Sequence, residues 1–421
     1  MQDRDPPAPT TDAIPAGERL ATLDFVRGVA VLGIVVANIV AMGQPIIAYG
    51  WPGGFIGGPG PYSEWLWGAQ LVLVDGKFRG LFTLLFGAGM VLFHRRAKAQ
   101  GRGRGLLARR LAWLGLFGFL HWALLWRGDI LMAYAVSGLL VLWFVGWEWH
   151  RQLVLGLIGY AVGAVMGLAS SVSMAATAQG RFPPGSAMAA IQHGLRETEA
   201  AEIADARVDS ALTISGDYLG TVRHSLEHHL AEIPGTLGIG LFETAPLMLI
   251  GMALLGAGVF EERPGRDRQL RPGWLLWGAG TVLTLPLAWW TIARGITYWD
   301  SFAALYGWLP VPQLLSALGL MLLLVRVGSA GGGWPAMRLN DAGRCAFTNY
   351  IGTSALALVV FSGWGFGLFG TLGRFELYAL VLGFWALMLA WPRWWLARFR
   401  HGPLEWLWRC LTYGRRVSLR R

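Results

Sequence analysis

Three polar side chains interrupt a long apolar stretch near the start of the chain, LDFVRGVAVLGIVVAN (23–38). Asp24 and Arg27 lie at its beginning, and Asn38 follows Arg27 by eleven residues. A helix would bring all three to one face, with Arg27 and Asn38 about 16 Å apart along the axis. Ionisable groups at such depth usually face a bundle interior or a wet cavity. The spacing predicts a polar path through a bundle or, for Asp24 and Arg27 alone, a structural ion pair.

A histidine and an aspartate further along the chain offer acid–base chemistry. His121 lies late in the stretch GLFGFLHWALLWRGD, and Arg110, eleven residues earlier, would share its helical face. A helical hairpin at residues 127–128 would fold Asp129 back towards His121, where a carboxylate would orient the ring and stabilise its charged form. Histidine suits proton transfer because its pKa lies near neutrality. The alternative is a histidine at a helix end, with Asp129 as the next N-cap.

Two cations begin another apolar stretch. Lys77 and Arg79 could bind an anionic acceptor or a donor phosphate, and Asp75 could pair with one of them. The alternative is that both are interfacial cations whose side chains reach back to water. Glu243, at the head of a later apolar stretch, is a further acid. It could equally be a favourable charge at a helix N-terminus.

The segment GRCAFTNYIGTS (343–354) places polar groups at the start of an apolar helix. Arg344 and Asn349 offer donors for a phosphate or for the amides of a pantetheine arm. An amide inside such a helix is costly unless it is paired, so the alternative for Asn349 is a hydrogen bond to a neighbouring helix.

The sequence HSLEH (224–228) has the spacing of a zinc protease motif. His224 and His228 would share one helical face as ligands, Glu227 would be the base, and a third ligand would be His229, Glu232 or Glu243. Metal catalysis, adventitious metal binding and a solvated loop are all open. Because the motif is short and nothing else in the chain resembles these proteases, we take the solvated loop and expect no metal.

Composition places these residues in a membrane protein. Of the 421 residues 54% are hydrophobic and 14% are charged, whereas a soluble domain has roughly 25% charged residues. The net charge of +10 comes largely from arginines in short loops and the tail, and no nucleic-acid-binding pattern is present, so no nucleic acid partner is expected. The two cysteines imply no disulfide framework. The polar first twenty residues are not expected to be a cleaved signal peptide.

Apolar stretches recur often enough to predict an all-α, polytopic integral membrane helix bundle of about ten transmembrane helices. The predicted spans are 23–43, 77–94, 106–126, 129–147, 153–173, 237–260, 272–293, 303–326, 343–363 and 374–397. A further helix near 62–75 is predicted to lie on the membrane surface or dip into it.

Charge orients this bundle. Segments 94–110 and 261–271 and the tail from Arg393 are basic, which places them in the cytosol, whereas the acidic segment 174–234 is placed outside. Both termini are then cytosolic. The predicted divisions are a cytosolic tail (1–22), a first bundle of about five spans (23–173), an external polar segment (174–234), a second bundle of about five spans (235–398) and a basic cytosolic tail (399–421).

Five separated motifs resemble known families. LDFVRGVAVLGIVVAN resembles the first span of transmembrane acyltransferases of the heparan-alpha-glucosaminide N-acetyltransferase type and of bacterial O-acyltransferases. Together with it, four further segments resemble the YeiB family of bacterial inner-membrane proteins: DGKFRGLFTLLFGAGMVLF (75–93), HWALLWRGDILMAYAVSGLL (121–140), GRCAFTNYIGTS (343–354) and GPLEWLWRCLTYGRR (402–416). In the O-acyltransferases a catalytic histidine follows an arginine after ten intervening residues. Asn38 stands at that position here, as in the heparan type, and asparagine can hold a carbonyl but cannot act as a base.

The resemblance implies transfer of an acyl group from cytosolic acyl-CoA, with acetyl-CoA as the expected donor, to an extracytoplasmic sugar or lipid-linked acceptor. The expected residues are His121, Asp129 and Asn38 for catalysis, Arg27, Arg110, Arg344 and Asn349 for the donor, and Lys77, Arg79, Asp24 and Glu243 for the acceptor. The expected partner is the lipid bilayer, and a homodimer with a second copy of the chain is also considered. The alternatives are a transporter of a small anion or lipid, which would use the same intramembrane charges, and a non-catalytic scaffold.

Overall fold

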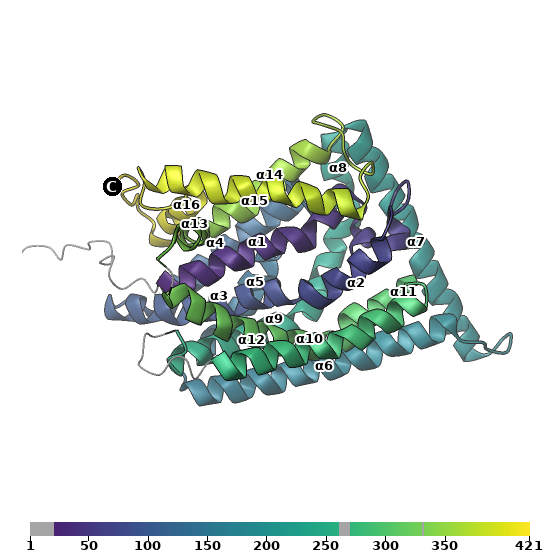
Figure 1. Ribbon diagram of the computed structural model, residues 1–421, viewed down its shortest axis with the longest axis horizontal. Coiled ribbons are helices and arrows are strands. Elements are labelled where there is room, and N and C mark those ends of the chain that lie inside the picture. The colour runs from purple at the N-terminus through teal and green to yellow at the C-terminus, as the bar shows by residue number, and fades with distance from the viewer. Residues whose placement is uncertain (1–20, 261–269, 331) are drawn as a thin grey trace, which may run out of the picture.

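The computed structural model describes residues 21–260, 270–330 and 332–421 (Figure 1). The predicted cytosolic tail (1–22) therefore lies almost wholly outside the described residues, as does most of the basic segment 261–271. Within the described ranges the chain forms helices and no strand, and β pairing is limited to an isolated bridge between Phe399 and Arg420.

The helices follow one another with short connections. Those of the first half are α1 (Ala21–Gly43), α2 (Ser63–Leu73), α3 (Lys77–Ala99), α4 (Gly103–Leu124), α5 (Leu131–Val141), α6 (Trp149–Gln179), α7 (Ala187–Ser215) and α8 (Tyr218–His224). Those of the second half are α9 (Ile233–Gly256), α10 (Leu270–Ala293), α11 (Tyr298–Phe302), α12 (Pro310–Ala330), α13 (Trp334–Arg344), α14 (Ala346–Phe361), α15 (Arg374–Leu396) and α16 (Pro403–Tyr413). The short turns are the 3-10 turns η2 (Ile46–Tyr49), η3 (Pro52–Gly54), η4 (Leu142–Phe144) and η6 (Leu230–Glu232) and the π-helical turns η5 (Ser225–His229) and η8 (Ala303–Trp308).

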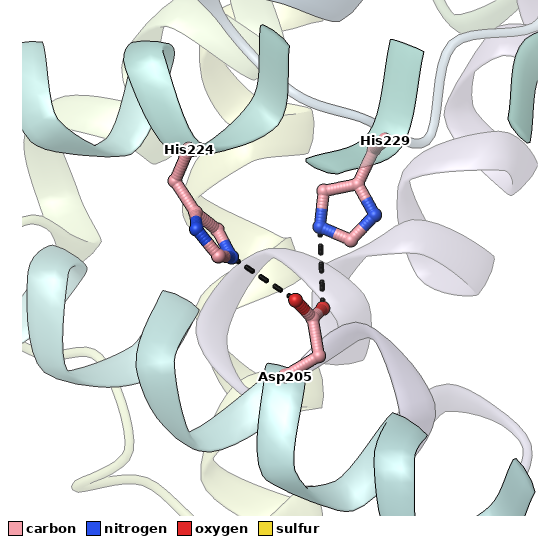
Figure 2. A group of neighbouring side chains, drawn as sticks. All are labelled: Asp205, His224 and His229. Atoms are coloured by element: carbon pink, nitrogen blue, oxygen red, sulfur yellow. Dashed lines mark hydrogen bonds and ion pairs between the residues drawn. The ribbon is translucent and has the colours of Figure 1, made fainter. Parts of the chain in front are cut away.

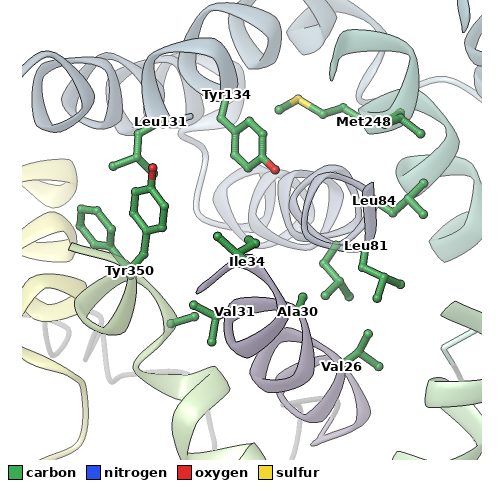
Figure 3. Close-up of a cluster of buried hydrophobic side chains, with 14 of the residues drawn as sticks. Val26, Ala30, Val31, Ile34, Leu81, Leu84, Leu131, Tyr134, Met248 and Tyr350 are labelled. Carbon is green, nitrogen blue, oxygen red and sulfur yellow. The ribbon is translucent and has the colours of Figure 1, made fainter. Parts of the chain in front are cut away.

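Helix α1 forms the centre of the bundle. Its most apolar window is 72% buried, whereas that of α6 is 11% buried, so α6 belongs to the periphery. Figure 3 shows Ala30, Val31 and Ile34 of α1 packed among side chains of α3, α5 and α14. The same view shows the hydroxyl groups of Tyr134 and Tyr350 among these apolar side chains. Asp24, Arg27 and Asn38 therefore belong to an apolar helix that is surrounded by other helices of the bundle.

Glycines allow two helix pairs to touch through their backbones. An added Cβ at Gly28 of α1 would lie 2.0 Å from the carbonyl oxygen of Leu339, and one at Gly343 of α13 would lie 1.8 Å from that of Asp24. Helices α3 and α9 make the same kind of contact through Gly87 and Gly251. Small residues of this kind let helices approach closely where lipid provides no hydrophobic driving force.

The outer faces of the peripheral helices are apolar, as expected for a membrane protein. Large hydrophobic side chains are exposed along α6, α10 and α15, including Ile158, Val165, Leu275 and Leu382, and a water-soluble protein rarely exposes so large an apolar patch. Helices α1, α6, α10, α12 and α15 are long and apolar enough to cross a membrane, and two bent pairs raise that number to seven. One pair is α13 with α14, bent by 81°, and the other runs from Tyr218 to Gly256.

Several predicted boundaries need correction. The stretch 129–147 gives only a short apolar helix, Leu131–Phe144, and the helix predicted from 303 begins at Pro310 after a π-helical turn. Helix α6 continues to Gln179, beyond its predicted end at 173. Helix α2, predicted to lie on the membrane surface or to dip into it, packs against α10 through buried Trp67 and Leu71, and both alternatives stay predictions. The start of α1 and the C-terminus lie at one end of the bundle, and α7 crosses the opposite end (Figure 1).

Candidate functional site

His121 and Asp129 are in contact, as the hairpin predicts. His121 lies in the last turn of α4, and its Nδ1 is 2.9 Å from Oδ1 of Asp129, with both side chains fully enclosed. The other carboxylate oxygen accepts the backbone N–H of Met132 at 2.8 Å, in the first turn of α5. Asp129 therefore caps α5 and also orients the His121 ring. The sequence offered these as alternatives, an orienting carboxylate or an N-cap, and the structure shows that one side chain can do both.

The second ring nitrogen of His121 has no protein partner. Its Nε2 is buried and accepts no hydrogen bond from any described residue. With Nδ1–H donated to Asp129, Nε2 carries a lone pair. A buried acceptor left unpaired costs about 1–3 kcal/mol, and such groups often have a functional explanation. The ring of Tyr350 packs 5.1 Å from that of His121, and the Tyr350 hydroxyl accepts the N–H of Ile130 at 3.2 Å.

A cavity of about 300 Å³, called here the inner cavity, is lined in part by Tyr350, which packs on His121. At its deep end are Ile130, Leu131, Tyr134 and Tyr350. The arginines that line it are Arg27, Arg96, Arg110, Arg344 and Arg409. A cationic mouth thus continues into a largely apolar passage that ends at the tyrosine packed on His121.

The arginines of the inner cavity differ in how they are held. Arg27 forms an ion pair with Asp24 at 2.7 Å, which is the structural pairing foreseen as an alternative. Arg344 lies 3.6 Å from Asp341 and donates to the carbonyl oxygen of Arg400 at 3.3 Å. The guanidinium of Arg110 stacks 3.5 Å above the ring of Trp408, and no described carboxylate lies within ion-pair distance of it. The Arg110 guanidinium therefore keeps hydrogen-bonding capacity for a phosphate.

Helix α16 closes the inner cavity, which sequence reasoning missed. Glu405 accepts the N–H groups of Phe347 and Thr348 at 2.8 and 3.1 Å and the hydroxyl of Thr348 at 2.6 Å, so it caps the start of α14. Burial raises the pKa of Glu405. Trp408 donates to the carbonyl oxygen of Arg110 at 2.8 Å. The available signal was the spacing of Glu405, Trp408 and Thr412 on one face in the segment 402–416.

A smaller cavity of about 130 Å³, called the outer pocket, is lined by residues of α1, α4, α7, α8 and α14, among them Trp122 and Ser354. Trp122 follows His121 directly, and Ser354 lies one helical turn beyond Tyr350. His121 itself lines neither cavity, but it contacts Tyr350 of the inner cavity and neighbours Trp122 of the outer pocket.

Other predicted site residues lie elsewhere. Asn38 is half-buried on α1 and does not line either cavity. Lys77 is 2% exposed and donates to the carbonyl oxygen of Leu71 at 2.7 Å, which satisfies the C-terminus of α2. The Lys77 side chain therefore does not reach back to water, which was the alternative that the sequence offered. Asp75 accepts hydrogen bonds from Tyr49 and Gln70.

Arg79 and Glu243 form a separate ion pair between α3 and α9 at 2.9 Å. Gln313 of α12 donates to Glu243 at 3.2 Å. Asn349 is buried, donates to the carbonyl oxygens of Ala342 and Met388, and accepts from Trp391 at 2.7 Å. The Asn349 amide therefore forms hydrogen bonds to a neighbouring helix, which was the alternative to donor binding. Asn349 does not line the inner cavity.

Comparison with known proteins places this architecture in a family. A family model described as a protein of unknown function (DUF418) matches residues 254–415. The chain is 32% identical to the uncharacterized protein YeiB of Escherichia coli (strain K12) over 420 residues, which cover 94% of this chain and 96% of that protein. The chain belongs to the YeiB family.

Two further relatives of this YeiB-family chain align over nearly their whole length. They are the uncharacterized protein YxaH of Bacillus subtilis (strain 168), 27% identical over 94% of each chain, and an uncharacterized 39.9 kDa protein in the amylase 3' region of Bacillus acidopullulyticus, 26% identical over 97% of this chain and 98% of that one. No solved structure matches. In this YeiB-family protein the family model covers Arg344, Tyr350 and Glu405 but not His121 or Asp129.

Proposed function

We propose that this YeiB-family protein is an integral membrane acyltransferase. It moves an acyl group, acetyl in the simplest case, from cytosolic acyl-CoA to a hydroxyl or amine of an extracytoplasmic acceptor such as a sugar or a lipid-linked molecule. The observation that carries the proposal is the enclosed His121–Asp129 pair, whose Nε2 is buried without a partner among the described residues and whose ring packs on Tyr350 of the arginine-lined inner cavity.

The inner cavity suits the donor. Its arginines match the phosphates of CoA, and Arg110, which has no carboxylate partner among the described residues, is the first candidate. The cavity of about 300 Å³ is at the lower end of the range of ligand sites, so the acyl-pantetheine arm would occupy it and the nucleotide would lie at its mouth. Because Tyr350 packs on the enclosed ring of His121, it must move for the thioester to reach Nε2.

The chemistry follows from the tautomer that Asp129 selects. The acceptor's oxygen or nitrogen attacks the thioester carbonyl carbon while Nε2 of His121 takes the acceptor's proton. The carbon–sulfur bond then breaks, and the imidazolium returns the proton to the CoA thiolate. In a two-step variant, Nε2 attacks the carbonyl carbon itself and carries the acyl group to the acceptor. Asp129 stabilises the positive ring in the first route.

The same proposal includes a membrane topology. Counting α3, α4 and α5 with the five long helices and the two bent pairs gives ten spans. The basic connection between α3 and α4 and the tail after α15 would face the cytosol of a bacterial inner membrane, and α7 would lie outside. The inner cavity then opens towards cytosolic acyl-CoA.

Calorimetry of the purified protein in detergent, titrated with acetyl-CoA, tests the donor site. We expect micromolar binding, weakened about tenfold by Arg110→Ala because one charge-assisted phosphate contact is lost. His121→Ala should leave binding within twofold and abolish acyl release from acetyl-CoA in proteoliposomes. The matched control is Arg102→Ala, an exposed arginine that does not line the inner cavity and should change neither quantity.

A transporter of a small anion or lipid is the second candidate. The observation in its favour is the presence of two cavities near the ionisable His121, one lined by its neighbour Trp122 and the other by Tyr350, which packs on it. If acetyl-CoA evokes no heat while proteoliposomes show solute flux that His121→Ala stops, the acyltransferase proposal fails and transport replaces it.

A further inference from the structure

A cluster of titratable side chains outside the proposed site joins α7 to the segment that follows α8. Figure 2 shows His224 and His229 pointing at the carboxylate of Asp205, one towards each oxygen. His224 Nε2 lies 3.0 Å from Oδ1, and His229 Nε2 lies 3.2 Å from Oδ2. One ligand atom from each of the three residues lies within 4.8 Å of the other two.

A π-helical turn creates this arrangement. In an α-helix, residues five apart point about 140° away from each other. The π-helical turn η5 winds more slowly and brings His224 and His229 to the same side, and single π turns are frequent at functional sites. His228, which the sequence motif offers as a ligand, instead hydrogen-bonds through Nδ1 to the carbonyl oxygen of His224, and Glu227 pairs with Arg223.

The second ring nitrogen of His229 is buried beside Asp205 without a hydrogen bond. The Nδ1 atom of His229 faces Oε1 of Glu232 at 3.1 Å. Its Nε2 lies 3.2 Å from Oδ2 of Asp205 but has no hydrogen-bond partner among the described residues, and the side chain is 9% exposed. A bound cation at this position would satisfy both the nitrogen and the carboxylate.

Acids outnumber the arginines beside the cluster. Arg127 pairs with Asp209 and lies 3.8 Å from Asp205. Glu232 contacts His229, and Glu202 lies near Asp205 and Glu232. This excess of carboxylates favours a bound cation.

We propose that Asp205, His224 and His229 form a binding site for a divalent transition metal, with zinc as the preferred ion. Two imidazoles and one carboxylate are a common zinc ligand set. Tetrahedral ligands at about 2.0–2.1 Å from zinc lie about 3.3 Å apart, close to the two nitrogen–oxygen separations at Asp205. Glu232 supplies the carboxylate partner that metal-bound histidines usually have.

The fourth position has a protein candidate. Oδ1 of Asp209 is buried without a hydrogen-bond partner among the described residues and lies 3.5 Å from His224 Nε2. Water would fill the position otherwise. Arg127 and Asp209 also line the outer pocket, together with Ser225 of η5. The metal therefore fixes α7 against η5 in the wall of that pocket, and this role does not depend on acyl transfer.

Full-length protein without a histidine tag, purified in detergent and stripped with a chelator, tests the site. We expect zinc to bind at one ion per chain and to raise Tm. Co²⁺ added to the stripped protein should give the visible absorption of a tetrahedral complex, which added zinc then removes. His229→Ala and the isosteric Asp205→Asn should weaken zinc binding at least a hundredfold, and Glu232→Gln about tenfold because it removes an outer-shell partner.

His228→Ala is the matched control, since it removes a histidine of the same turn that is not in the ligand set. It should bind zinc within twofold of the parent chain. The site is refuted if zinc does not bind stoichiometrically, if Asp205→Asn binds zinc as the parent does, or if His228→Ala weakens binding as much as His229→Ala. A Tm that changes with pH but not with zinc or chelator would also refute it, because the cluster would then be an ion-pair network only.

Discussion

At the scale of single residues, histidines of this chain lie in two different environments. His121 is enclosed, receives one carboxylate on Nδ1 and keeps Nε2 free, which favours proton transfer. His224 and His229 share one carboxylate and lie on the polar segment outside the apolar bundle, which favours metal binding. The partners of the ring nitrogens, and not the residue type, decide whether a histidine is suited to proton transfer or to metal binding.

Asp129→Asn tests whether the His121 tautomer matters. An asparagine amide turned towards Nδ1 would donate to it and move the ring proton to Nε2, so the base would be lost while the amide oxygen could still cap α5. We expect acyl release from acetyl-CoA to fall about 10³–10⁴-fold, as in the Ser-His-Asp template. Calorimetry should show acetyl-CoA binding within twofold of the parent. Equal loss of binding and of acyl release would instead assign Asp129 a structural role.

At the scale of elements, the contact between α1 and α13 positions the mouth of the inner cavity. Asp24 and Arg27 of α1 and Arg344 of α13 all line that cavity, and Gly343 lets the two helices touch between them. A side chain there would have to separate the two backbones. The mouth therefore depends on a contact between two backbones and not only on its charged side chains.

Gly343→Ala should accordingly destabilise the protein, because its Cβ would lie 1.8 Å from the carbonyl oxygen of Asp24. Overpacking of this kind costs roughly 1–3 kcal/mol, which a lower Tm in detergent would register. Gly352→Ala, in the neighbouring helix α14, meets no atom within 4 Å and is the matched control. It should leave Tm unchanged or raise it slightly, since alanine favours a helix. Equal shifts for the two variants would contradict the backbone contact.

Sequence spacing predicts local relations well and distant ones poorly. The hairpin that joins His121 to Asp129 spans eight residues, and turn geometry alone places the two side chains together. Lys77 could not be placed from spacing, because its partner is a carbonyl oxygen freed by the end of α2. Glu405 caps a helix 57 residues earlier in the chain, and His229 depends on a π turn that helical periodicity does not foresee.

At the scale of the whole molecule, α1 runs between two chemically different ends. Arginines line the cavity at the end near the C-terminus, and carboxylates and histidines gather where α7 crosses the other end (Figure 1). This polarity is what a protein needs if it takes a donor from one side of a membrane and serves an acceptor on the other.

Cysteine labelling tests that orientation directly. The native thiols, buried Cys345 and half-buried Cys410, would first be replaced by alanine. Arg196→Cys on α7 and Arg416→Cys in the C-terminal tail then each place a thiol at an exposed position on opposite ends of the bundle. In intact spheroplasts a membrane-impermeant maleimide should label the first variant and reach the second only after lysis, since basic segments stay in the cytosol. The reverse pattern would place the arginine-lined cavity outside the cell, away from acyl-CoA, and would remove the basis of the acyltransferase proposal.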